Sequence, residues 1–407
     1  MGGDVPRQDP IDKLLGPGSK VFPIGTDRSS RASFFREGHR VDDRTLHWLA
    51  FHLAFLSCPA AGRRALRRFQ SVRNVFLSRA PDLEGLGLPD AAARAVVSRD
   101  AIRDAERELE KIRGKGYTLL TFEDPGYPRY LREIFDPPLV LYCAGRAEVL
   151  EDPGVAIVGS RRPTPYGRVL AEKLAGGLAS RGCTIVSGLA VGIDACAHWG
   201  AIREGRTIAV LGSGLDVCYP RVNRGLAEKI KEQGMVLTEF PLETPPLQQN
   251  FPVRNRIISG LAMALVVVEA AERSGSLISA GFALDQGREV MAVPGNVTSE
   301  MSRGTNGLLK AGAMLVESWE DVAGELPPPW REKLLAQKEE KAENTRNSLS
   351  EDESRLMKEL PMDAAVHVDE LAERTDFPVS GLLALLLGLE LRGLVVQHPG
   401  KLFQRRI

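Results

Sequence analysis

The sequence predicts an α/β fold for the central part of the chain, a doubly wound parallel β-sheet with helices on both faces. Short apolar segments alternate there with longer helical patterns from residue 151 to residue 323. The apolar segments carry almost no polar residues, as expected for strands that helices cover on both sides. Alternation of strands and crossover helices is typical of a Rossmann-like sheet.

The expected elements follow one another at regular intervals in this block. Strands are expected at Val155–Val158, Cys183–Val186, Thr207–Leu211, Met235–Thr238, Ala264–Glu269, Glu289–Val293 and Ala313–Val316. Helices are expected at Tyr166–Arg181, Ile193–Glu204, Arg221–Gln233, Arg254–Ala262, Ser276–Gln286 and Thr305–Lys310. In the first of these helices Leu170, Leu174 and Leu178 share one face, and Gly182 ends it.

Composition and pattern divide the rest of the chain around this block. Residues 1–40 are rich in Gly, Pro, Ser and Arg, and we expect them to be disordered. Residues 41–115 have short helical patterns that predict a small helical domain of the SAM or helix-hairpin-helix type. Residues 116–325 hold the Rossmann-like domain, including a lead-in segment with a strand at Leu139–Cys143, and residues 326–350 read as a polar linker.

The C-terminal residues 351–407 predict a winged-helix domain. Helices are expected at Ser350–Leu360, His367–Arg374 and Pro378–Arg392, followed by a hairpin at Leu394–Gln397 and Leu402–Gln404. The last helix is dominated by leucines, whereas a helix that reads the major groove should present Arg, Lys, Asn or Gln. Its composition therefore favours protein contact or core packing.

Bulk composition indicates a protein of the reducing cytoplasm. The chain has 43% hydrophobic and 26% charged residues, ordinary values for a globular protein, and its formal net charge is zero. The five cysteines form no CxxC pair, which argues against a disulfide framework and a zinc site. The N-terminus lacks the apolar stretch of a signal peptide, and the apolar run at residues 261–268 is far shorter than a membrane span.

The loops that follow the strands are the predicted functional sites, because ligands of open parallel sheets bind at the carboxyl ends of strands. Most of these loops contain Gly or Ser, and several precede a helix, whose free N–H groups and positive dipole end favour phosphate. Arginines in the loops match phosphate oxygens. The candidate phosphate-binding residues are Gly159, Ser160, Arg161, Gly188, Gly212, Arg254, Asn255, Arg256, Arg273, Ser274, Gly275, Ser276, Gly295 and Asn296.

Each glycine loop alone is equally well explained by a tight strand-to-helix turn. The usual nucleotide motifs are absent: the first strand is followed by GSRRPTPYG rather than GxGxxG, and no GxxxxGK[ST] occurs. Asp194 and His198 lie four apart on one helix, but capping and packing explain them better than acid–base catalysis. We expect no metal, no cofactor and no catalysis.

Two other groups of residues have both a structural and a functional interpretation. Arg63, Arg64, Arg67 and Arg68 cluster on one expected helix, where a solvated face is the simpler explanation and DNA contact the alternative. Tyr166, Tyr219 and Phe251 are candidates for base stacking, although packing is the better explanation of each.

Several motifs, in order and at matching spacing, resemble those of the DprA/Smf family (DNA-processing protein A). They are VAIVGSRRPTPYG, SGLAVGIDACAH, GSGLDVCYP, FPVRNRIISGL, RSGSLISA and VPGN followed by GTNGLLKAGA. The segments EDPGYPRYLREIFDPPLVLYCAG and DELAERTDFPVSGLLALLLGLELRGLVVQHPGKLFQ resemble the family's lead-in and its winged-helix tail. The resemblance covers nearly all of residues 43–407.

This resemblance implies a bacterial protein that binds incoming single-stranded DNA during natural transformation, protects it and loads the RecA recombinase onto it. It implies a homodimer formed through the Rossmann-like domain. It also implies a phosphate pocket that uses Arg161 and the basic residue before SGS, where many members have Lys and this chain has Arg273. The role of the winged helix is the least transferable feature.

Two alternatives stay open. One is a nucleotide-processing enzyme of the same Rossmann-like superfamily, similar to the LOG phosphoribohydrolases. Their PGGxGTxxE signature is missing, because the corresponding segment here is ERSGSLISAGFALD. The other is a transcription regulator that acts through the winged helix.

Overall fold

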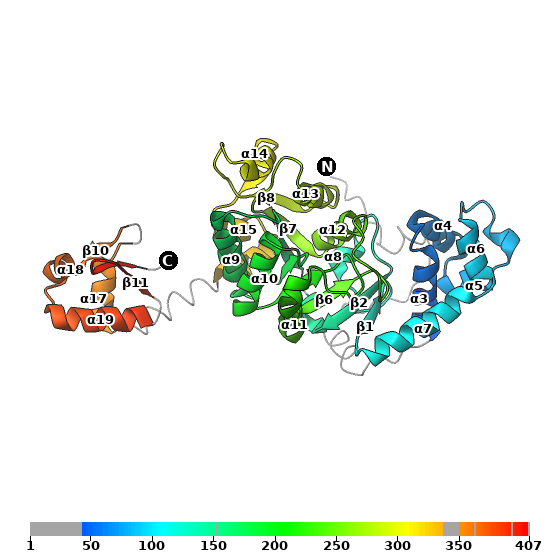
Figure 1. Cartoon of the computed structure of the whole chain (residues 1–407), viewed down its shortest axis with the longest axis horizontal. Coiled ribbons are helices and arrows are strands. Elements are labelled where there is room, and N and C mark those ends of the chain that lie inside the picture. Colours follow the sequence, from blue (N-terminus) through cyan, green and yellow to red (C-terminus); the bar gives the residue numbers. More distant parts are fainter. Residues whose placement is uncertain (1–42, 152, 337–349, 362–363, 392–393, 406–407) are drawn as a thin grey trace, which may run out of the picture. The chain divides into compact units, whose positions relative to one another are not determined.

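The computed structural model describes residues 43–151, 153–336, 350–361, 364–391 and 394–405 (Figure 1). Its chain divides into two compact units, residues 1–334 and 335–407. The segment 1–40, for which disorder is expected, lies outside the described residues. Among the described helices none is long and apolar enough to cross a membrane.

A nine-stranded sheet forms the centre of the first unit, with the order β1-β2-β6-β5-β4-β3-β7-β8-β9. The strands are β1 (Thr118–Thr121), β2 (Val140–Gly145), β3 (Gly154–Val158), β4 (Ile185–Ser187), β5 (Thr207–Val210), β6 (Met235–Thr238), β7 (Ala262–Val267), β8 (Glu289–Ala292) and β9 (Met314–Leu315). From β6 to β9 all neighbours are parallel, so the predicted doubly wound sheet is confirmed. The sheet is not wholly parallel, because β2 pairs antiparallel with β6 and β1 with β2.

Helices cover both faces of this sheet (Figure 1). One face carries α9 (Pro165–Ala179), α10 (Ile193–Glu204) and α11 (Arg224–Gln233), which pack in sequence, with α15 (Trp319–Gly324) beside α9. The other carries α12 (Asn250–Gly260) and α13 (Gly275–Asp285), with α14 (Arg303–Lys310) on β8 and the short α8 (Arg129–Arg132) on α12. Short 3-10 turns lie at Ala147–Leu150, Arg221–Asn223 and Glu300–Ser302.

Glycine allows a close contact between helices α9 and α10. A Cβ atom at Gly200 would lie 2.3 Å from the Glu172 carbonyl oxygen, so any larger residue would force the helices apart. Thr164 begins α9, since its Oγ1 accepts a hydrogen bond from the Gly167 N–H at 3.2 Å and Pro165 occupies the first turn.

The N-terminal part of the first unit is helical, as expected. Its helices are α3 (Asp43–Phe55), α4 (Pro59–Phe69), α5 (Val72–Leu77), α6 (Asp90–Val97) and α7 (Asp100–Gly114), with a 3-10 turn at Ala80–Leu83. Their buried side chains form one continuous apolar core with those of the sheet. His52 bridges to the sheet through a 2.7 Å hydrogen bond to the Glu239 carbonyl, and burial lowers its pKa to about 4. The proposed boundary between residues 115 and 116 stays a prediction.

Residues 328–336, placed in the polar linker by composition, are helical. Leu326 and Leu334 are buried, so an apolar face holds this stretch in place. Residues 337–349 lie outside the described part of the chain.

The second unit is a winged helix. Helices α17 (Glu351–Glu359), α18 (Val368–Thr375) and α19 (Val379–Leu391) pack on a three-stranded sheet of order β10-β12-β11. Its strands are β10 (Val366–His367), β11 (Val395–His398) and β12 (Leu402–Arg405). A separate apolar core, which includes Leu356, Leu371, Leu386 and Phe403, makes the unit self-contained. The first strand, only two residues long, was not expected from the sequence.

Candidate nucleic-acid interface

The carboxyl ends of the parallel strands form one edge of the sheet, and the chain changes direction at this edge. After β3 it runs outward through β4, β5 and β6, and then returns to place β7 on the other side of β3. The loops after β3 and β7 therefore flank the switch point, where open parallel sheets bind ligands.

On the β4–β5 side of the switch point, two arginines and two aromatic rings come together. We call Arg161, Tyr219, Phe251 and Arg254 the arginine–aromatic cluster. The Phe251 ring lies 5.4 Å from the Arg161 guanidinium carbon, 5.9 Å from that of Arg254 and 5.7 Å from the Tyr219 ring centroid. Arg161 is exposed and Tyr219 is 44% exposed, whereas Arg254 is only 4% exposed. The cluster thus combines a free cation with ring surface open to solvent.

Arg254 ties two strand ends together beneath this cluster. Its Nη1 donates to the carbonyl oxygens of Gly188, at 2.6 Å, and of Val210. Burial lowers the pKa of its guanidinium to about 10, partly opposed by the nearby Asp194, so the group stays charged at neutral pH. Its side chain shapes the site and adds positive potential, but it offers little surface to a ligand.

Arg256 is also one of the predicted phosphate-binding residues, but in the structure its guanidinium pairs with two carboxylates. Its Nη2 lies 2.6 Å from Glu239 Oε2 and its Nε 3.5 Å from Asp136 Oδ2, and the residue is 8% exposed. Residues two apart on α12 point to different sides, so Arg254 reaches the carbonyl oxygens after β4 and in β5, while Arg256 turns to the carboxylates of Glu239 and Asp136. This arrangement speaks against phosphate contact by Arg256. Asn255, between them, is half-buried, with its Nδ2 3.5 Å from the Gly275 oxygen.

In the loops that surround the cluster, glycines allow the backbone to lie very close to neighbouring side chains. A Cβ atom at Gly188 would lie 2.3 Å from Arg254 Nη1, and one at Gly212 would lie 3.0 Å from the Phe251 ring. Gly159 packs in the same way against Ile193. Ser160 is buried, and its Oγ accepts from the Arg162 N–H at 3.0 Å, which fixes the turn that carries Arg161.

His198 packs internally, as expected, but Asp194 does not cap α10: Gly192 precedes the helix, and Asp194 lies in its first turn, where its carboxylate holds the preceding loop. Asp194 Oδ2 accepts from the N–H groups of Gly188, at 3.2 Å, and Ala190, at 3.4 Å. His198 is fully buried, its Nδ1 lies 2.7 Å from Thr207 Oγ1, and burial lowers its pKa to about 3. A histidine that stays neutral and contacts no solvent is poorly suited to exchange protons with a substrate.

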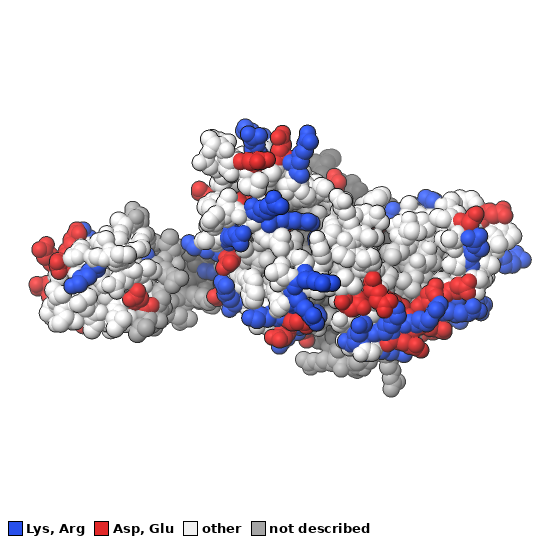
Figure 2. Space-filling view, in the orientation of Figure 1, with Lys and Arg blue, Asp and Glu red and all other residues white. Residues whose placement is uncertain are grey.

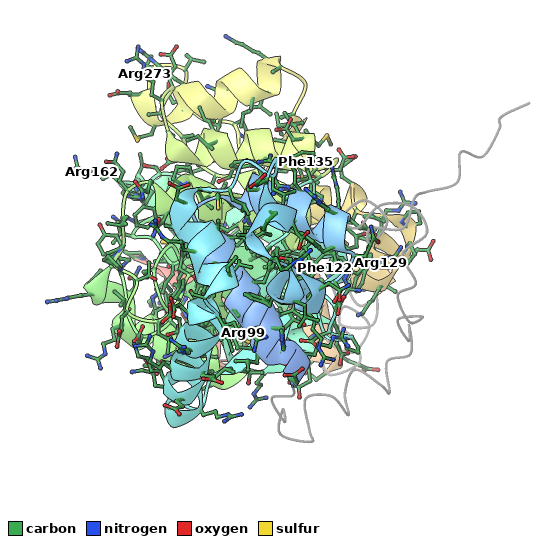
Figure 3. The ribbon with its side chains drawn as sticks, turned by 90° about the vertical axis from the view of Figure 1, so that its right-hand side faces the viewer. Arg99, Phe122, Arg129, Phe135, Arg162 and Arg273 are labelled. Atoms are coloured by element: carbon green, nitrogen blue, oxygen red, sulfur yellow. The ribbon has the colours of Figure 1, made fainter. Side chains whose placement is uncertain are left out.

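On the other side of the switch point, the loop after β7 leads into α13. Ser274 begins this helix: its Oγ accepts from the Ser276 N–H at 3.3 Å and lies 2.7 Å from Ser276 Oγ. Gly275 is exposed, and Arg273 extends into solvent, as does Arg162 on the loop after β3 (Figure 3). Arg273 therefore stands free just before a helix N-terminus.

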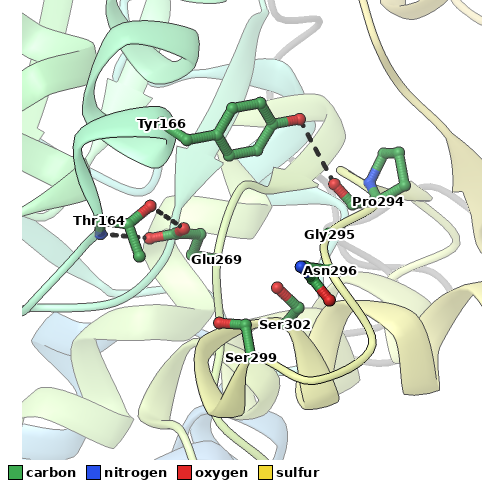
Figure 4. Close-up of a pocket in the computed structure, with 8 residues that line it drawn as sticks. All are labelled: Thr164, Tyr166, Glu269, Pro294, Gly295, Asn296, Ser299 and Ser302. Carbon is green, nitrogen blue, oxygen red and sulfur yellow. Dashed lines mark hydrogen bonds between the residues drawn. The ribbon is translucent and has the colours of Figure 1, made fainter.

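Gly295 and Asn296, in the loop after β8, line a pocket of about 520 Å³ (Figure 4). The Gly295 N–H donates to Asn306 Oδ1 at 3.2 Å, and its carbonyl accepts from Asn306 Nδ2 at 3.0 Å. No Lys or Arg is among the residues that line the pocket. It differs in charge from the arginine–aromatic cluster.

Sequence reasoning missed several basic residues at this edge. Arg162, Arg221 and Arg224 are exposed, and Asn223 Nδ2 bonds the Leu189 oxygen at 2.8 Å, which holds the segment with Arg221 and Arg224 against the loop after β4. Figure 2 shows basic side chains spread over the α9–α14 part of the first unit. The signal in the sequence that could have identified these arginines is their position in or directly after a strand-end loop.

The helix α12 begins at Asn250, four residues before the expected start at Arg254. Pro252 lies in the first turn of this helix, a position where proline is tolerated. The early start matters because it places Phe251 on the first turn, over the strand ends. Asn250 Nδ2 donates to the Gly212 carbonyl at 3.1 Å and so anchors that turn.

The N-terminal arginine cluster makes mainly intramolecular contacts. Arg63 pairs with Asp136, Arg64 Nε donates to the Leu86 oxygen at 2.8 Å, and Arg68 Nη1 donates to the Glu84 oxygen at 3.0 Å. The nearby helix α7 carries acidic and basic side chains side by side (Figure 2). Neither surface has the excess of free cations that phosphate binding requires.

The winged helix offers no basic reading surface on α19. Val379, Leu383 and Leu387 are exposed on it, and its sequence contains neither Lys nor Arg. This arrangement argues against direct readout of bases in the major groove.

Together, the fold and the site define a Rossmann-like protein with arginines at its strand-end loops and a separate winged-helix unit. The family model of DNA recombination-mediator protein A matches residues 118–327, and that of the DprA winged helix domain matches residues 340–401. The chain therefore belongs to the DprA/Smf family.

Individual relatives agree with this assignment. Protein Smf of Synechocystis is 35% identical over 393 residues, 88% of this chain and 98% of the relative. DNA processing protein DprA of Streptococcus pneumoniae is 43% identical over 225 residues, 55% of this chain and 78% of the relative. The X-ray structure of DprA from S. pneumoniae superposes with a TM-score of 0.61 at 34% identity and covers 70% of this chain and 99% of that one.

Proposed function

We propose that this chain binds single-stranded DNA along the strand-end edge of its sheet. The observation that carries the proposal is the arginine–aromatic cluster, in which the exposed Arg161 lies over the Phe251 ring beside the half-exposed Tyr219. A guanidinium attracts phosphate and a ring surface stacks a base, and proteins that bind single strands combine these two features.

Phosphate contact would be made at two places along this edge. Arg161 serves the β4–β5 side and Arg273 the β7 side, where Ser274 begins α13 and the positive end of the helix dipole favours an anion. Gly159, Ser160, Gly188, Gly212, Gly275 and Ser276 would shape the backbone around the phosphates, while Arg254 would act from beneath.

A titration at two salt concentrations tests this proposal. The protein should bind a single-stranded oligonucleotide more tightly than the matching duplex, because the bases of a duplex are already stacked. Affinity should fall as salt rises, because each neutralised phosphate releases counterions. Equal affinity for both forms of DNA, or no binding, would refute the proposal.

We further propose that the bound strand is incoming DNA in the cytoplasm of a transforming bacterium, and that the protein protects it and loads RecA onto it. The family's description as a recombination mediator supports this role. Strand exchange by RecA on DNA covered with single-strand-binding protein should be faster in its presence. No acceleration would refute the loading role while leaving DNA binding intact.

A homodimer is part of the same proposal. The edge strand β9 exposes Met314 (42%) and Leu315 (43%), an apolar strand edge of the kind that pairs with another chain. Leu315→Glu should yield a monomer in light scattering. A wild-type monomer at micromolar concentration would contradict the proposal.

We propose a role without catalysis. The alternative, a LOG-like nucleotide-processing enzyme, is disfavoured because the buried Asp194 holds the loop after β4 and the buried His198 packs against Thr207. Incubation with a panel of nucleoside monophosphates should release no free base, and release of one would favour the enzyme.

A further inference from the structure

A second feature of the strand-end edge differs chemically from its arginines: a pocket of about 520 Å³ beside the switch point. Its wall is formed by Thr164, Tyr166, Glu269, Pro294, Gly295, Asn296, Ser299 and Ser302. These residues come from the loops after β3, β7 and β8 and from the first turn of α9. Such a volume is in the range of pockets that hold small ligands.

A buried carboxylate stands in this pocket without a cation. Glu269 is 4% exposed, and among the described residues no Lys, Arg or His forms an ion pair with it. Its Oε1 accepts from the Thr164 hydroxyl at 2.6 Å and its Oε2 from the Thr164 N–H at 2.8 Å. Gly167 lets the start of α9 approach so closely that a Cβ there would lie 2.4 Å from Oε2. The helix N-terminus therefore stabilises a negative charge at this place.

Each carboxylate oxygen keeps a second acceptor position, since a carboxylate offers about four lone-pair sites. The opposite wall supplies a donor. Asn296 Oδ1 accepts hydrogen bonds from the N–H of Thr298, at 2.9 Å, and from the hydroxyl of Thr298, at 2.8 Å. These bonds identify the other terminal atom of the Asn296 side chain as the amide nitrogen Nδ2. That nitrogen has no hydrogen-bond partner in the described part of the chain. The Tyr166 ring lies at the mouth, with its hydroxyl 3.4 Å from the Pro294 oxygen (Figure 4).

A ligand for this pocket must present two adjacent donors toward Glu269 and an acceptor toward Asn296. Phosphate has no donor and would be repelled by the carboxylate. Among the DNA bases only guanine carries two neighbouring donors on its Watson–Crick edge, N1–H and the 2-amino group, next to the O6 acceptor. Cytosine and adenine place an acceptor beside their single amino group, and thymine places acceptors on both sides of its N3–H.

We propose that this carboxylate pocket takes up a guanine base from the bound DNA strand. Glu269 would accept from guanine N1–H and the 2-amino group, and Asn296 would donate to O6. The exposed ring of Tyr166, 53% open to solvent, would cover the base, as aromatic side chains do for unpaired bases. The inference rests on the proposed DNA binding and deepens it: phosphates contact the arginines, and one base enters the pocket.

The experiment is a binding titration of the full chain with oligo-dT, with the same oligonucleotide carrying one central guanine, and with inosine in place of that guanine. Wild-type protein should bind the guanine-containing strand about tenfold more tightly than oligo-dT, the discrimination expected of a bidentate base contact. Inosine, which lacks the 2-amino group, should fall between the two.

Two variants test the assignment of residues. Glu269→Gln replaces one acceptor by a donor and should abolish the guanine preference while oligo-dT still binds. Asn296→Asp retains the oxygen that Thr298 bonds but puts an acceptor opposite O6, so it should also abolish the preference. If the Glu269 variant does not fold, the Asn296 variant still tests the guanine pocket. Asn296 is exposed, and aspartate at this position keeps the oxygen that accepts from the Thr298 N–H, so this variant should fold.

The outcomes separate this inference from the proposed function. Equal affinity of wild-type protein for all three oligonucleotides overturns the guanine pocket but leaves DNA binding standing. A preference that survives in the folded variants also overturns it. If neither wild-type protein nor any variant binds oligo-dT, the proposed function fails, and the pocket assignment fails with it.

Discussion

Arg161 and Arg256, both predicted from the sequence to contact phosphate, should respond in opposite ways to substitution. Arg256 is 8% exposed, and its guanidinium bonds the buried Glu239 at 2.6 Å and approaches Asp136 at 3.5 Å. Arg256→Met keeps most of the apolar stem but leaves the Glu239 carboxylate buried without its cation. Burial already raises the pKa of Glu239, and Arg256 is the main group that opposes this rise.

The magnitude follows from the cost of a broken buried ion pair, ~3 kcal/mol or more. For a unit of this size the loss corresponds to a fall in Tm of roughly 4 °C or more. Calorimetry of Arg256→Met should show it, while the affinity for single-stranded DNA, measured well below Tm, should stay within about twofold of wild type. The double variant Arg256→Met/Glu239→Gln should recover part of the stability, because no charge is left unpaired.

Arg161→Ala is the matched control. Its guanidinium is exposed and forms no ion pair with a carboxylate in the described part of the chain, so the Tm should change by about 1 °C or less. Its DNA affinity should fall about tenfold at low salt. The reasoning would be refuted if Arg256→Met lost DNA binding at an unchanged Tm, or if Arg161→Ala lowered the Tm and left DNA binding intact.

Three further outcomes are expected. Arg273→Ala should weaken binding to all strand sequences and reduce the slope of log affinity against log salt by about one, as loss of one phosphate contact requires; an unchanged slope would remove Arg273 from the site. His52, whose pKa is lowered to about 4, binds its proton less readily in the folded state, so stability should fall as the pH drops from 6.5 to 4. The stability advantage of wild type over His52→Gln should therefore shrink by up to roughly 3 kcal/mol across this range, and a constant difference in urea denaturation would contradict the assignment. Gly188→Ala should lower both stability and DNA affinity, because its Cβ would lie 2.3 Å from Arg254 Nη1; retention of both by the variant would show that Arg254 can move at no cost.

Most of the sheet was predictable because its strands are continuous apolar segments bounded by turns. Strand β6 agrees with its expected limits, and β3 and β5 differ by one residue at one end. The short strand β1 was missed because four residues, TLLT, give too little periodicity to distinguish it from a loop. Its pairing with β2 depends on contacts between segments about twenty residues apart.

The candidate site was predictable only as a set of loops. The sequence places Arg161, Arg254, Arg256 and Arg273 near strand ends, and all four have the same chemistry. Their environments differ: Arg161 and Arg273 are exposed, Arg254 holds carbonyl oxygens, and Arg256 pairs with carboxylates. For Arg254 and Arg256, burial and partner choice depend on which face of α12 the side chain leaves, and local sequence does not contain that information.

By itself the sequence determined the doubly wound sheet, the winged-helix tail and the motifs of the family, because each depends on local periodicity or on residues close together in the chain. Only the tertiary structure decided which arginines remain free, that Phe251 and Tyr219 meet over the strand ends, and that Glu269 lies in a pocket without a cation. These features join residues that lie from 32 positions apart, as for Tyr219 and Phe251, to 105 positions apart, as for Thr164 and Glu269. Their energies come from desolvation and close approach, which exist only once the chain has folded.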